Sequence, residues 1–415
     1  MTLAPTPAPP LAIVPPEDVG LDADRLARID AHLRRRYLEP GRIAGCLSLV
    51  ARDGKVAWLS ALGDRDRERG LPMTEDTLFR IYSMTKPITS VALMSLYEEG
   101  HFQLDDPVAK LVPALGELRV FRSGNHPHWV TDPCERPMTL RDLLTHMSGL
   151  TYGFNERTNV DAAYRELGVG DRDSSLQEMV DTLAGLPLEF SPGERWNYSV
   201  STDVCGYLVE VLSGQPFDRF LAERIFAPLG MTDTGFHVPA DQIERFAANY
   251  ERGPDKALRL LDDPRASPYL EPPRLFSGGG GLVSTAADYL RFCQMLLGGG
   301  ELDGARILGP RTLDLMTTNH LPGGVDLSSL ASGSFSETTY DGVGFGLGFA
   351  VFLDQARAQA VGSPGEFYWG GAASTIFWVD PLEDLAVVFL VQLMPSGTFD
   401  FRGQLRSIVY GAIVD

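Results

Sequence analysis

Ser83-Met84-Thr85-Lys86 opens a segment, residues 83–99, that is apolar nearly all round and therefore predicts a buried central helix. Pro87 is compatible with that helix only in its first turn, so Ser83 is expected at or near the helix N-terminus. Side chains three residues apart on a helix share one face. The Ser83 hydroxyl and the Lys86 amine are therefore predicted to lie side by side.

Lys86 is one of only four lysines in a chain with 36 basic residues. Arginine stays protonated in proteins, whereas a buried lysine can lose its proton and act as a base. A serine beside such an amine is the minimal equipment of an enzyme that forms an acyl-serine. At a helix start, the Ser83 N–H also points at an incoming oxyanion, which the helix dipole favours. Taken alone, the pair is better explained by an ordinary buried helix with a snorkelling lysine.

Tyr198 stands just before a predicted amphipathic helix, residues 200–212. A tyrosine in such a place relays a serine proton when a nearby lysine acidifies its phenol. An amphipathic core residue with a satisfied hydroxyl is the alternative.

Trp369-Gly370-Gly371 lies in a predicted strand. Adjacent glycines inside a strand indicate a close approach to the backbone, or else a bulge or tight bend. An edge strand lining a cleft would donate a second oxyanion N–H from Ala372.

These three segments, in this order, resemble the serine β-lactamase and penicillin-binding-protein superfamily. Within that superfamily they are most similar to family VIII carboxylesterases, which are class C β-lactamase-like esterases. The resemblance covers nearly the whole chain. It includes four further stretches: Leu143-Leu144-Thr145-His146-Met147-Ser148-Gly149-Leu150, Tyr198-Ser199-x-x-x-Asp203, Pro228-Leu229-Gly230-Met231 and Gly279-Gly280-Gly281-Leu282.

The resemblance implies a role for each site residue. Ser83 would be the nucleophile, Lys86 and Tyr198 would form the base couple, and Trp369 to Gly371 would replace a lysine-Thr-Gly strand motif. The oxyanion would lie between the N–H groups of Ser83 and Ala372. Which member of the couple takes the proton stays open, because a coupled pair titrates jointly.

Two departures from the β-lactamase pattern predict a shift in substrate. Val200 stands where those enzymes have an asparagine, and Trp369 stands where they have the lysine that holds a substrate carboxylate. A carboxylate would lose its charge-assisted partner, and an indole offers apolar area instead. Neutral esters with short or medium acyl groups are therefore expected. Four aromatic residues in predicted loops are candidates for the acyl-pocket wall, although surface or core roles fit each equally: Phe121, Trp129, Tyr152 and Phe154.

The resemblance implies a fold of the α/β class, α+β in type, with an antiparallel sheet flanked by helices. Residues 1–115 and 281–415 are expected to form this domain, and residues 116–280 a mostly helical second domain that supplies Tyr198. The first 16 residues are expected to form an extended proline-rich arm. The expected elements are helices over 22–37, 139–147, 200–212, 286–297 and 401–413, strands over 45–51 and 56–62 joined at Asp53-Gly54, and strands over 345–353, 366–371, 374–379 and 385–392.

Composition excludes several classes of partner. A net charge of −19 disfavours binding to nucleic acid or to anionic lipid. The chain has no apolar run of about 18 residues and no basic N-terminal region, so neither a membrane span nor a secretory signal is expected, and a cytoplasmic location is predicted. The four widely spaced cysteines indicate buried thiols in a reducing compartment.

The remaining alternatives carry less weight. No Gly-x-Ser-x-Gly elbow and no phosphate-binding glycine motif occurs. His146 beside Ser148 suggests a Ser-His pair, but a histidine that holds a loop is favoured. His126, His128 and Cys134 lack the spacing of a metal site, so neither metal nor cofactor is expected. An acyltransferase, a D-amino-acid peptidase, a weak β-lactamase and a non-catalytic sensor stay open, as does the oligomeric state.

Overall fold

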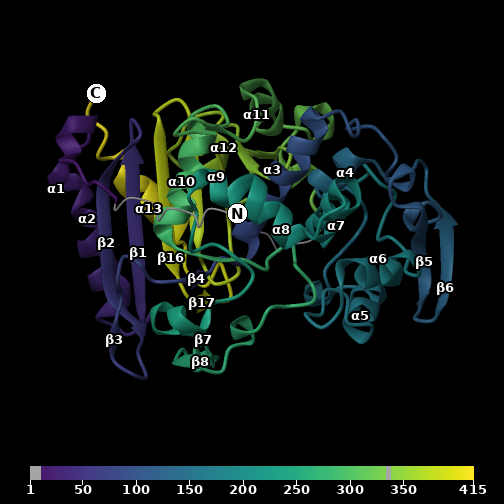
Figure 1. Ribbon diagram of the computed structural model, residues 1–415, viewed down its shortest axis with the longest axis horizontal. Coiled ribbons are helices and arrows are strands. Elements are labelled where there is room, and N and C mark those ends of the chain that lie inside the picture. The colour runs from purple at the N-terminus through teal and green to yellow at the C-terminus, as the bar shows by residue number, and fades with distance from the viewer. Residues whose placement is uncertain (1–10, 333–337) are drawn as a thin grey trace, which may run out of the picture.

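The computed structural model describes residues 11–332 and 338–415, and its centre is an antiparallel sheet (Figure 1). Eight strands pair in the order β12-β13-β14-β15-β16-β1-β2-β3. This confirms the predicted α+β fold. The strand bounds are β12 Val343–Phe345, β13 Ala350–Phe352, β14 Phe367–Gly370, β15 Ile376–Asp380, β16 Leu385–Val391, β1 Gly45–Arg52, β2 Lys55–Asp66 and β3 Leu71–Pro72.

The β1–β2 hairpin turns at Asp53-Gly54, as the sequence predicts. Both residues have positive φ, 51° and 71°, which is the geometry of a type I′ turn. Strand β1 is buried along its whole length and pairs on its other edge with β16, from Cys46 opposite Val391 to Arg52 opposite Leu385. The N-terminal hairpin and the C-terminal meander therefore form one continuous sheet.

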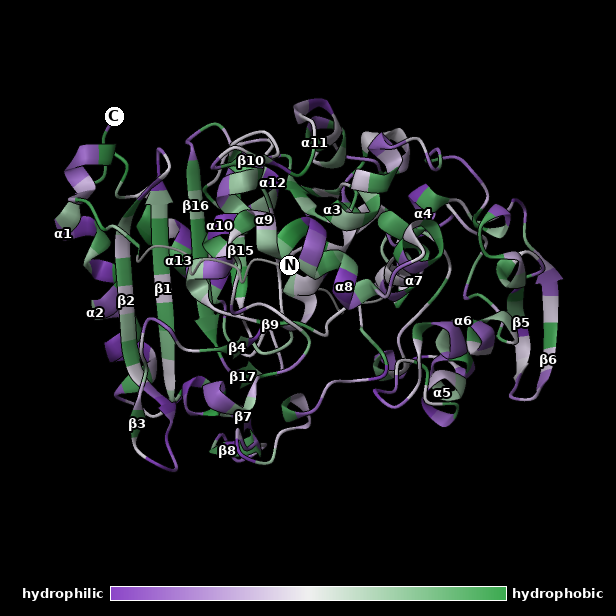
Figure 2. Ribbon diagram, in the orientation of Figure 1, coloured by the Kyte–Doolittle hydropathy of each residue, from purple (hydrophilic) through white to green (hydrophobic). Residues whose placement is uncertain are grey.

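Helices cover both faces of the sheet. Side chains alternate between the faces along each strand. Phe377 of β15 packs on Tyr289 of α10 (Ala286–Leu297), with ring centroids 5.0 Å apart. Phe389 of β16 points the other way and meets Phe401 of α13 (Phe401–Tyr410) at 5.1 Å. Figure 2 shows many hydrophobic residues along β1 and β16.

The region on the side of the molecule away from β1 and β2 consists of helices and one hairpin (Figure 1). Thr139, Thr158 and Ser175 each form a capping box that starts a helix. The proposed division at residues 116 and 280 stays a prediction. The elements of this region are β5 Arg119–Asn125, β6 His128–Pro133, α4 Leu140–Leu144, α5 Asn159–Glu166, α6 Leu176–Ala184, α7 Ser201–Ser213 and α8 Phe217–Leu221.

Small additional sheets tie distant segments together. Strand β4 (Phe79–Arg80), just before Ser83, pairs with β9 (Val283–Ser284). Strand β17 pairs with β7, which pairs with β8. The remaining bounds are β7 Asn249–Arg252, β8 Leu258–Asp262, β17 Leu393–Met394, β10 Glu301–Leu302, β11 Ala305–Arg306, α1 Ala23–Leu26, α2 Arg28–Leu33, α9 Ala227–Leu229, α11 Pro310–Met316 and α12 Gln355–Ala358.

Several expected elements differ from the structure; the helix over 139–147, for example, ends at Leu144. The single strand over 345–353 is two strands, β12 and β13, because Gly346 and Gly348 lie in a turn where Gly348 has a φ of 96°. The helix over 22–37 is interrupted at Ala27 and ends in a π-helical turn over Arg34–Leu38. Strand β14 is an interior strand rather than an edge strand, although its pairing with β13 stops at Tyr368.

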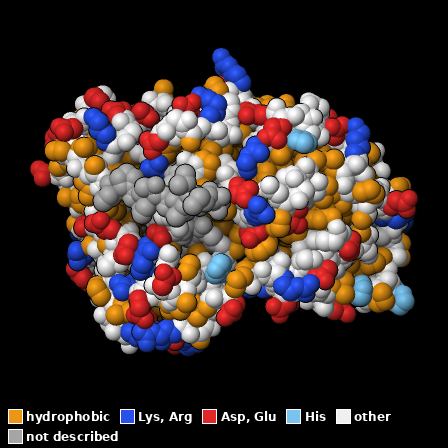
Figure 3. All heavy atoms as spheres, viewed as in Figure 1, with side chains coloured by type: hydrophobic (Ala, Val, Ile, Leu, Met, Phe, Trp, Pro, Cys, Tyr) orange, Lys and Arg blue, Asp and Glu red, His pale blue; other side chains and the backbone are white. Residues whose placement is uncertain are grey.

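Three of the four cysteines match the prediction of buried thiols. Cys46, Cys205 and Cys293 are buried and free, and burial raises the pKa of each thiol. Cys134 is free and partly exposed. Within residues 11–332 and 338–415, no helix combines the length and the apolar character that crossing a membrane requires. Figure 3 shows acidic and basic side chains interspersed over one face of the molecule.

Candidate active site

Ser83 lies in a short 3₁₀ turn, Tyr82–Met84, that leads directly into the buried helix α3 (Thr85–Glu98). Tyr82 has a φ of 43°, a conformation that few non-glycine residues adopt, and this sharp turn begins the helix at the serine. Ser83 and Lys86 are 8% and 2% exposed, respectively. Lys86 Nζ donates to Ser83 Oγ across 3.2 Å, so the structure brings the predicted pair together.

Lys86 Nζ also donates to groups outside helix α3. It donates to the carbonyl oxygen of Gly279 across 2.7 Å and to the Tyr152 hydroxyl across 3.0 Å. The ammonium group also lies 4.5 Å from the centre of the Tyr198 ring, within cation–π range. These contacts fix the amine in one position beside Ser83.

Tyr198 reaches Ser83 from the turn before α7. Its hydroxyl donates to Ser83 Oγ across 2.6 Å. The ring is packed among other aromatic groups, with centroids 5.1 Å from His146, 5.3 Å from Tyr152 and 5.5 Å from Trp369. Close packing of this kind leaves the phenol little freedom to turn away from the serine.

His146 is a buried structural residue and does not pair with Ser148. Its Nδ1 lies 3.2 Å from Ser199 Oγ, whereas Ser148 hydrogen-bonds to Ser201 across 2.7 Å. Burial, with a smaller contribution from the positive charge of Lys86, holds the pKa of His146 well below its ordinary value. The ring is therefore neutral and supports Tyr198 through contact.

Asp203 is a buried carboxylate that orders the glycine loop. Its Oδ1 accepts from the Ser277 hydroxyl across 2.5 Å and from the Gly279 N–H across 3.0 Å. Burial raises the pKa of this carboxyl, and the nearby Lys86 charge lowers it in part. Because Gly279 also supplies a carbonyl to Lys86, Asp203 positions the lysine through the loop. The sequence motif contained Asp203, but its spacing gave no indication of this role.

Trp369 lies on the same face of β14 as the catalytic candidates. Its indole Nε1 donates to the Tyr198 hydroxyl across 3.4 Å, and its ring meets Phe345 edge to face at 5.4 Å. The residue is completely buried. The position therefore presents an apolar wall with one weak donor, and it carries no positive charge.

Ala372 lies in the tight loop between β14 and β15. Gly371 N–H donates to the Thr375 carbonyl, Ser374 N–H donates to the Gly371 carbonyl, and Ser374 has a φ of 65°. This is a three-residue hairpin loop with a left-handed residue at its end. The Thr375 hydroxyl donates to the carbonyl of Ile81 across 3.4 Å. The loop that carries Ala372 therefore packs against the turn that carries Ser83.

Gly371 is required for that packing. A Cβ built on it would lie 2.4 Å from the Ile81 carbonyl oxygen and 2.3 Å from Thr375 Oγ1. We therefore expect Gly371→Ala to push the hairpin away from Ser83 and to lower kcat/KM for an ester by about 100-fold, because small misplacements of a catalytic group have effects of this size. The measurement is steady-state hydrolysis of p-nitrophenyl butyrate.

Gly185→Ala is the matched control for this substitution. The added Cβ would meet only the Thr182 carbonyl, at an ordinary 3.6 Å, at the end of helix α6. Its kcat/KM should stay within about twofold of the unaltered protein. Equal activity of the two glycine variants would mean that the hairpin does not contribute to the site.

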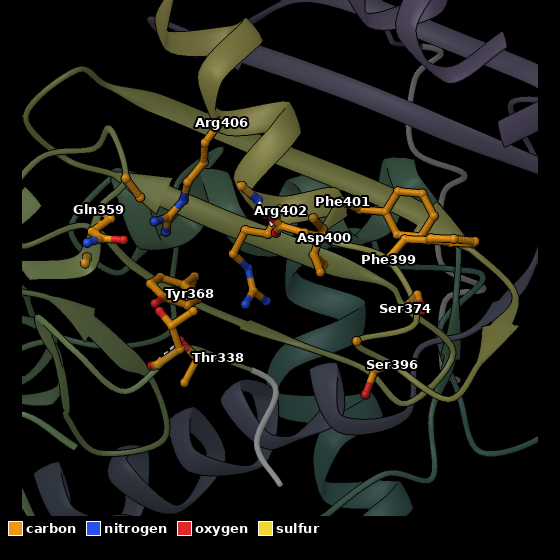
Figure 4. A pocket seen from close by; sticks show the side chains of 16 residues that line it. Thr338, Gln359, Tyr368, Ser374, Ser396, Phe399, Asp400, Phe401, Arg402 and Arg406 are labelled. Carbon is orange, nitrogen blue, oxygen red and sulfur yellow. Dashed lines mark hydrogen bonds between the residues drawn. The ribbon is translucent and has the colours of Figure 1, made fainter. Parts of the chain in front are cut away.

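A pocket of about 380 Å³ opens on the opposite face of β14 (Figure 4). Tyr368, Arg402 and Arg406 line it, whereas Ser83, Lys86 and Tyr198 do not. Arg402 donates to the carbonyl oxygen of Trp369 across 3.0 Å and lies 4.7 Å from the centre of the Tyr368 ring. Helix α13 thus supports the end of β14 from the face opposite Ser83.

The four candidate wall residues fall into two groups. Phe121 and Trp129 face each other across the β5–β6 hairpin, with ring centroids 5.7 Å apart. Tyr152 touches Lys86, and Phe154 stacks on Tyr152. Sequence reasoning placed Tyr152 only among possible wall residues, because nothing in its local sequence indicates contact with a lysine 66 positions away. Among the described residues, no group of three or more His, Cys, Asp or Glu side chains is arranged to hold a metal ion.

An antiparallel sheet flanked by helices, with serine, lysine and tyrosine meeting beside the strand β14, defines a serine hydrolase of the β-lactamase type. The chain belongs to the beta-lactamase family, whose profile matches residues 31–409. This confirms the resemblance to family VIII esterases of the serine β-lactamase superfamily.

Relatives of known name cover most of the chain. Esterase EstB of Burkholderia gladioli is 35% identical to this chain. The alignment covers 93% of this chain and 95% of the length of EstB. Protein Rv1367c of Mycobacterium tuberculosis is 39% identical, and the alignment covers 88% of this chain and 90% of the length of Rv1367c. Among solved structures, EstCE1, described as a hydrolase with promiscuous acyltransferase activity, has a TM-score of 0.78 at 28% identity and covers 94% of this chain and 99% of its own.

Proposed function

We propose that the protein is a serine esterase that hydrolyses neutral carboxylic esters through an acyl-enzyme on Ser83. One observation carries the proposal: Ser83 Oγ accepts hydrogen bonds from both the Tyr198 hydroxyl, at 2.6 Å, and Lys86 Nζ, at 3.2 Å. A serine with two proton-transfer partners at contact distance is equipped for nucleophilic attack. The names of EstB and EstCE1 support the assignment of ester hydrolysis.

The reaction balances with these groups alone. In the reactive form the Lys86–Tyr198 couple lacks one proton, so one of its members accepts from Ser83 Oγ instead of donating to it. Ser83 Oγ attacks the ester carbonyl while its proton passes to the couple, and the couple then protonates the departing alcohol. Water attacks the acyl-serine in the second half, gives one proton to the couple, and the couple returns it to Ser83. In both tetrahedral intermediates, the N–H groups of Ser83 and Ala372 stabilise the oxyanion.

The walls of the site favour uncharged substrates. Trp369 is fully buried beside the Tyr198 hydroxyl and replaces a cation with an indole. The Val200 side chain lacks the amide that an asparagine would supply at this position. The Val200 backbone N–H donates to the Thr151 carbonyl. A substrate carboxylate would enter this environment without a charged partner at Trp369, which is unfavourable.

Acyl transfer is the second candidate. Simvastatin synthase from Aspergillus terreus, in its LovD6 form, has a TM-score of 0.78 at 27% identity, over 94% of this chain and 98% of its own. The same acyl-serine would be released by an alcohol instead of water. β-Lactam hydrolysis, D-amino-acid peptide hydrolysis and stoichiometric acylation without release would also start from this intermediate.

A substrate panel on the purified protein separates these reactions. We expect hydrolysis of p-nitrophenyl acetate and butyrate, with kcat/KM at least tenfold above that for nitrocefin, because the site lacks the cation that holds a β-lactam carboxylate. Faster nitrocefin turnover would overturn the ester assignment in favour of a β-lactamase. Faster transfer to added alcohol than to water would make the protein an acyltransferase, and a single burst without turnover would make it a sensor.

A further inference from the structure

Two aromatic rings form a continuous surface from the catalytic lysine to the solvent. Tyr152 receives a hydrogen bond from Lys86 Nζ at 3.0 Å and is half-buried. Phe154 stacks on Tyr152, with centroids 4.5 Å apart and planes 20° from parallel. Phe154 is 54% exposed. The pair therefore presents apolar area that begins at the reacting groups and ends at the protein surface.

The segment that carries these rings is firmly held. The Thr151 hydroxyl donates to Asp161 Oδ1 across 2.6 Å, and the Thr151 carbonyl accepts from the Val200 N–H. The Asn155 amide donates to the Thr151 hydroxyl across 3.1 Å and to the carbonyl of Tyr198 across 3.5 Å. The loop is thus connected to the backbone at Tyr198 and at Val200.

The Phe154 side chain gains less from burial than a core phenylalanine does, because the residue is 54% exposed. A large apolar side chain that is exposed and yet fixed in place next to a site is characteristic of ligand recognition. Such a ring is pre-ordered, so an apolar ligand that covers it releases water at little cost in side-chain entropy.

We propose that Phe154 is a specificity-determining residue that binds the apolar part of the ester, on either its acyl or its alcohol side. This inference rests on the proposed esterase function. Tyr152 connects this contact to the reacting centre, because its other edge touches Lys86 and Tyr198. Longer apolar groups cover more of the Phe154 ring, and their esters gain more from its presence.

Phe154→Ala tests the proposal with two substrate series. One series lengthens the acyl chain of p-nitrophenyl esters from acetate to octanoate, and the other lengthens the alcohol of acetate esters from methyl to hexyl. In at least one series, we expect the ratio of kcat/KM for the longest to the shortest member to fall by about tenfold. Phe154→Leu, which keeps an apolar side chain, should recover part of the ratio.

Leu261→Ala is the matched control, because Leu261 is an exposed apolar residue, 47% accessible, on strand β8. It should leave both ratios unchanged. Unaltered ratios in Phe154→Ala, together with normal hydrolysis of the acetate, would overturn the inference and leave the esterase proposal intact. Absence of ester hydrolysis in the unaltered protein would instead remove the proposed function itself. Thermal unfolding of each variant shows that it is folded.

Discussion

Ser83→Ala is expected to lower kcat/KM for p-nitrophenyl butyrate by about 10⁴-fold or more, since loss of a nucleophile that acts with its base as a unit has an effect of this order. The Ser83 hydroxyl lies at hydrogen-bond distance from both the Tyr198 hydroxyl and Lys86 Nζ, so the acyl group is expected on this residue. The measurement is steady-state hydrolysis, supported by mass spectrometry of the acylated peptide that contains residue 83 in the unaltered protein.

Ser90→Ala provides the control on the same helix. Ser90 is buried in α3, and its hydroxyl has no hydrogen-bond partner among the residues that the structure describes. Its removal should leave activity within about twofold. Full ester hydrolysis by a folded Ser83→Ala variant would exclude Ser83 as the nucleophile, and an acyl group found on another residue would identify the alternative.

Tyr198→Phe is expected to lower kcat by about 10²- to 10⁴-fold while KM changes little, the range that loss of a general acid–base group produces. The substitution removes one oxygen atom, whose hydrogen bond to Ser83 Oγ spans 2.6 Å. The ring contacts with His146 and Trp369 stay, so the fold should be retained. The test compares kcat and KM of the two proteins over a range of pH.

Tyr82→Phe is the matched control. Tyr82 precedes the nucleophile directly, and its hydroxyl accepts from Asn249 Nδ2 at 3.1 Å on the side of β7. Loss of that hydroxyl should change kcat by no more than a few fold. If both phenylalanine variants lost activity equally, the effect of Tyr198 would be one of packing near Ser83, and the assignment of Tyr198 to the proton-transfer couple would be wrong.

Local sequence signals predicted the elements that depend on neighbouring residues. Asp53-Gly54 needs positive φ at both positions, so its hairpin could be inferred from two residues. The helix over 286–297 has the predicted bounds because Thr285 caps its first turn, accepting from the Asp288 N–H. The site residues Ser83, Lys86, Tyr198 and Trp369 were identified by their motifs, and the structure places them in contact.

Contacts between segments that lie far apart in the sequence could not be predicted from local sequence patterns. The interior position of β14 depends on its pairing with β13 and β15. The contacts of Lys86 with Tyr152 and with the Gly279 carbonyl join segments 66 and 193 residues apart. A hydrophobic pattern shows which face of a helix is buried, but it does not show which neighbour fills that face. A cytoplasmic location and independence from cofactors stay predictions.

The order in which the site is assembled along the chain has a consequence for synthesis. Ser83 and Lys86 are translated well before β14, the hairpin loop with Ala372 and the supporting Arg402. The second edge of strand β1 is likewise paired only after β16 has been translated. The complete arrangement of Ser83, Tyr198 and the β14 hairpin loop therefore forms only after the C-terminal meander has been translated.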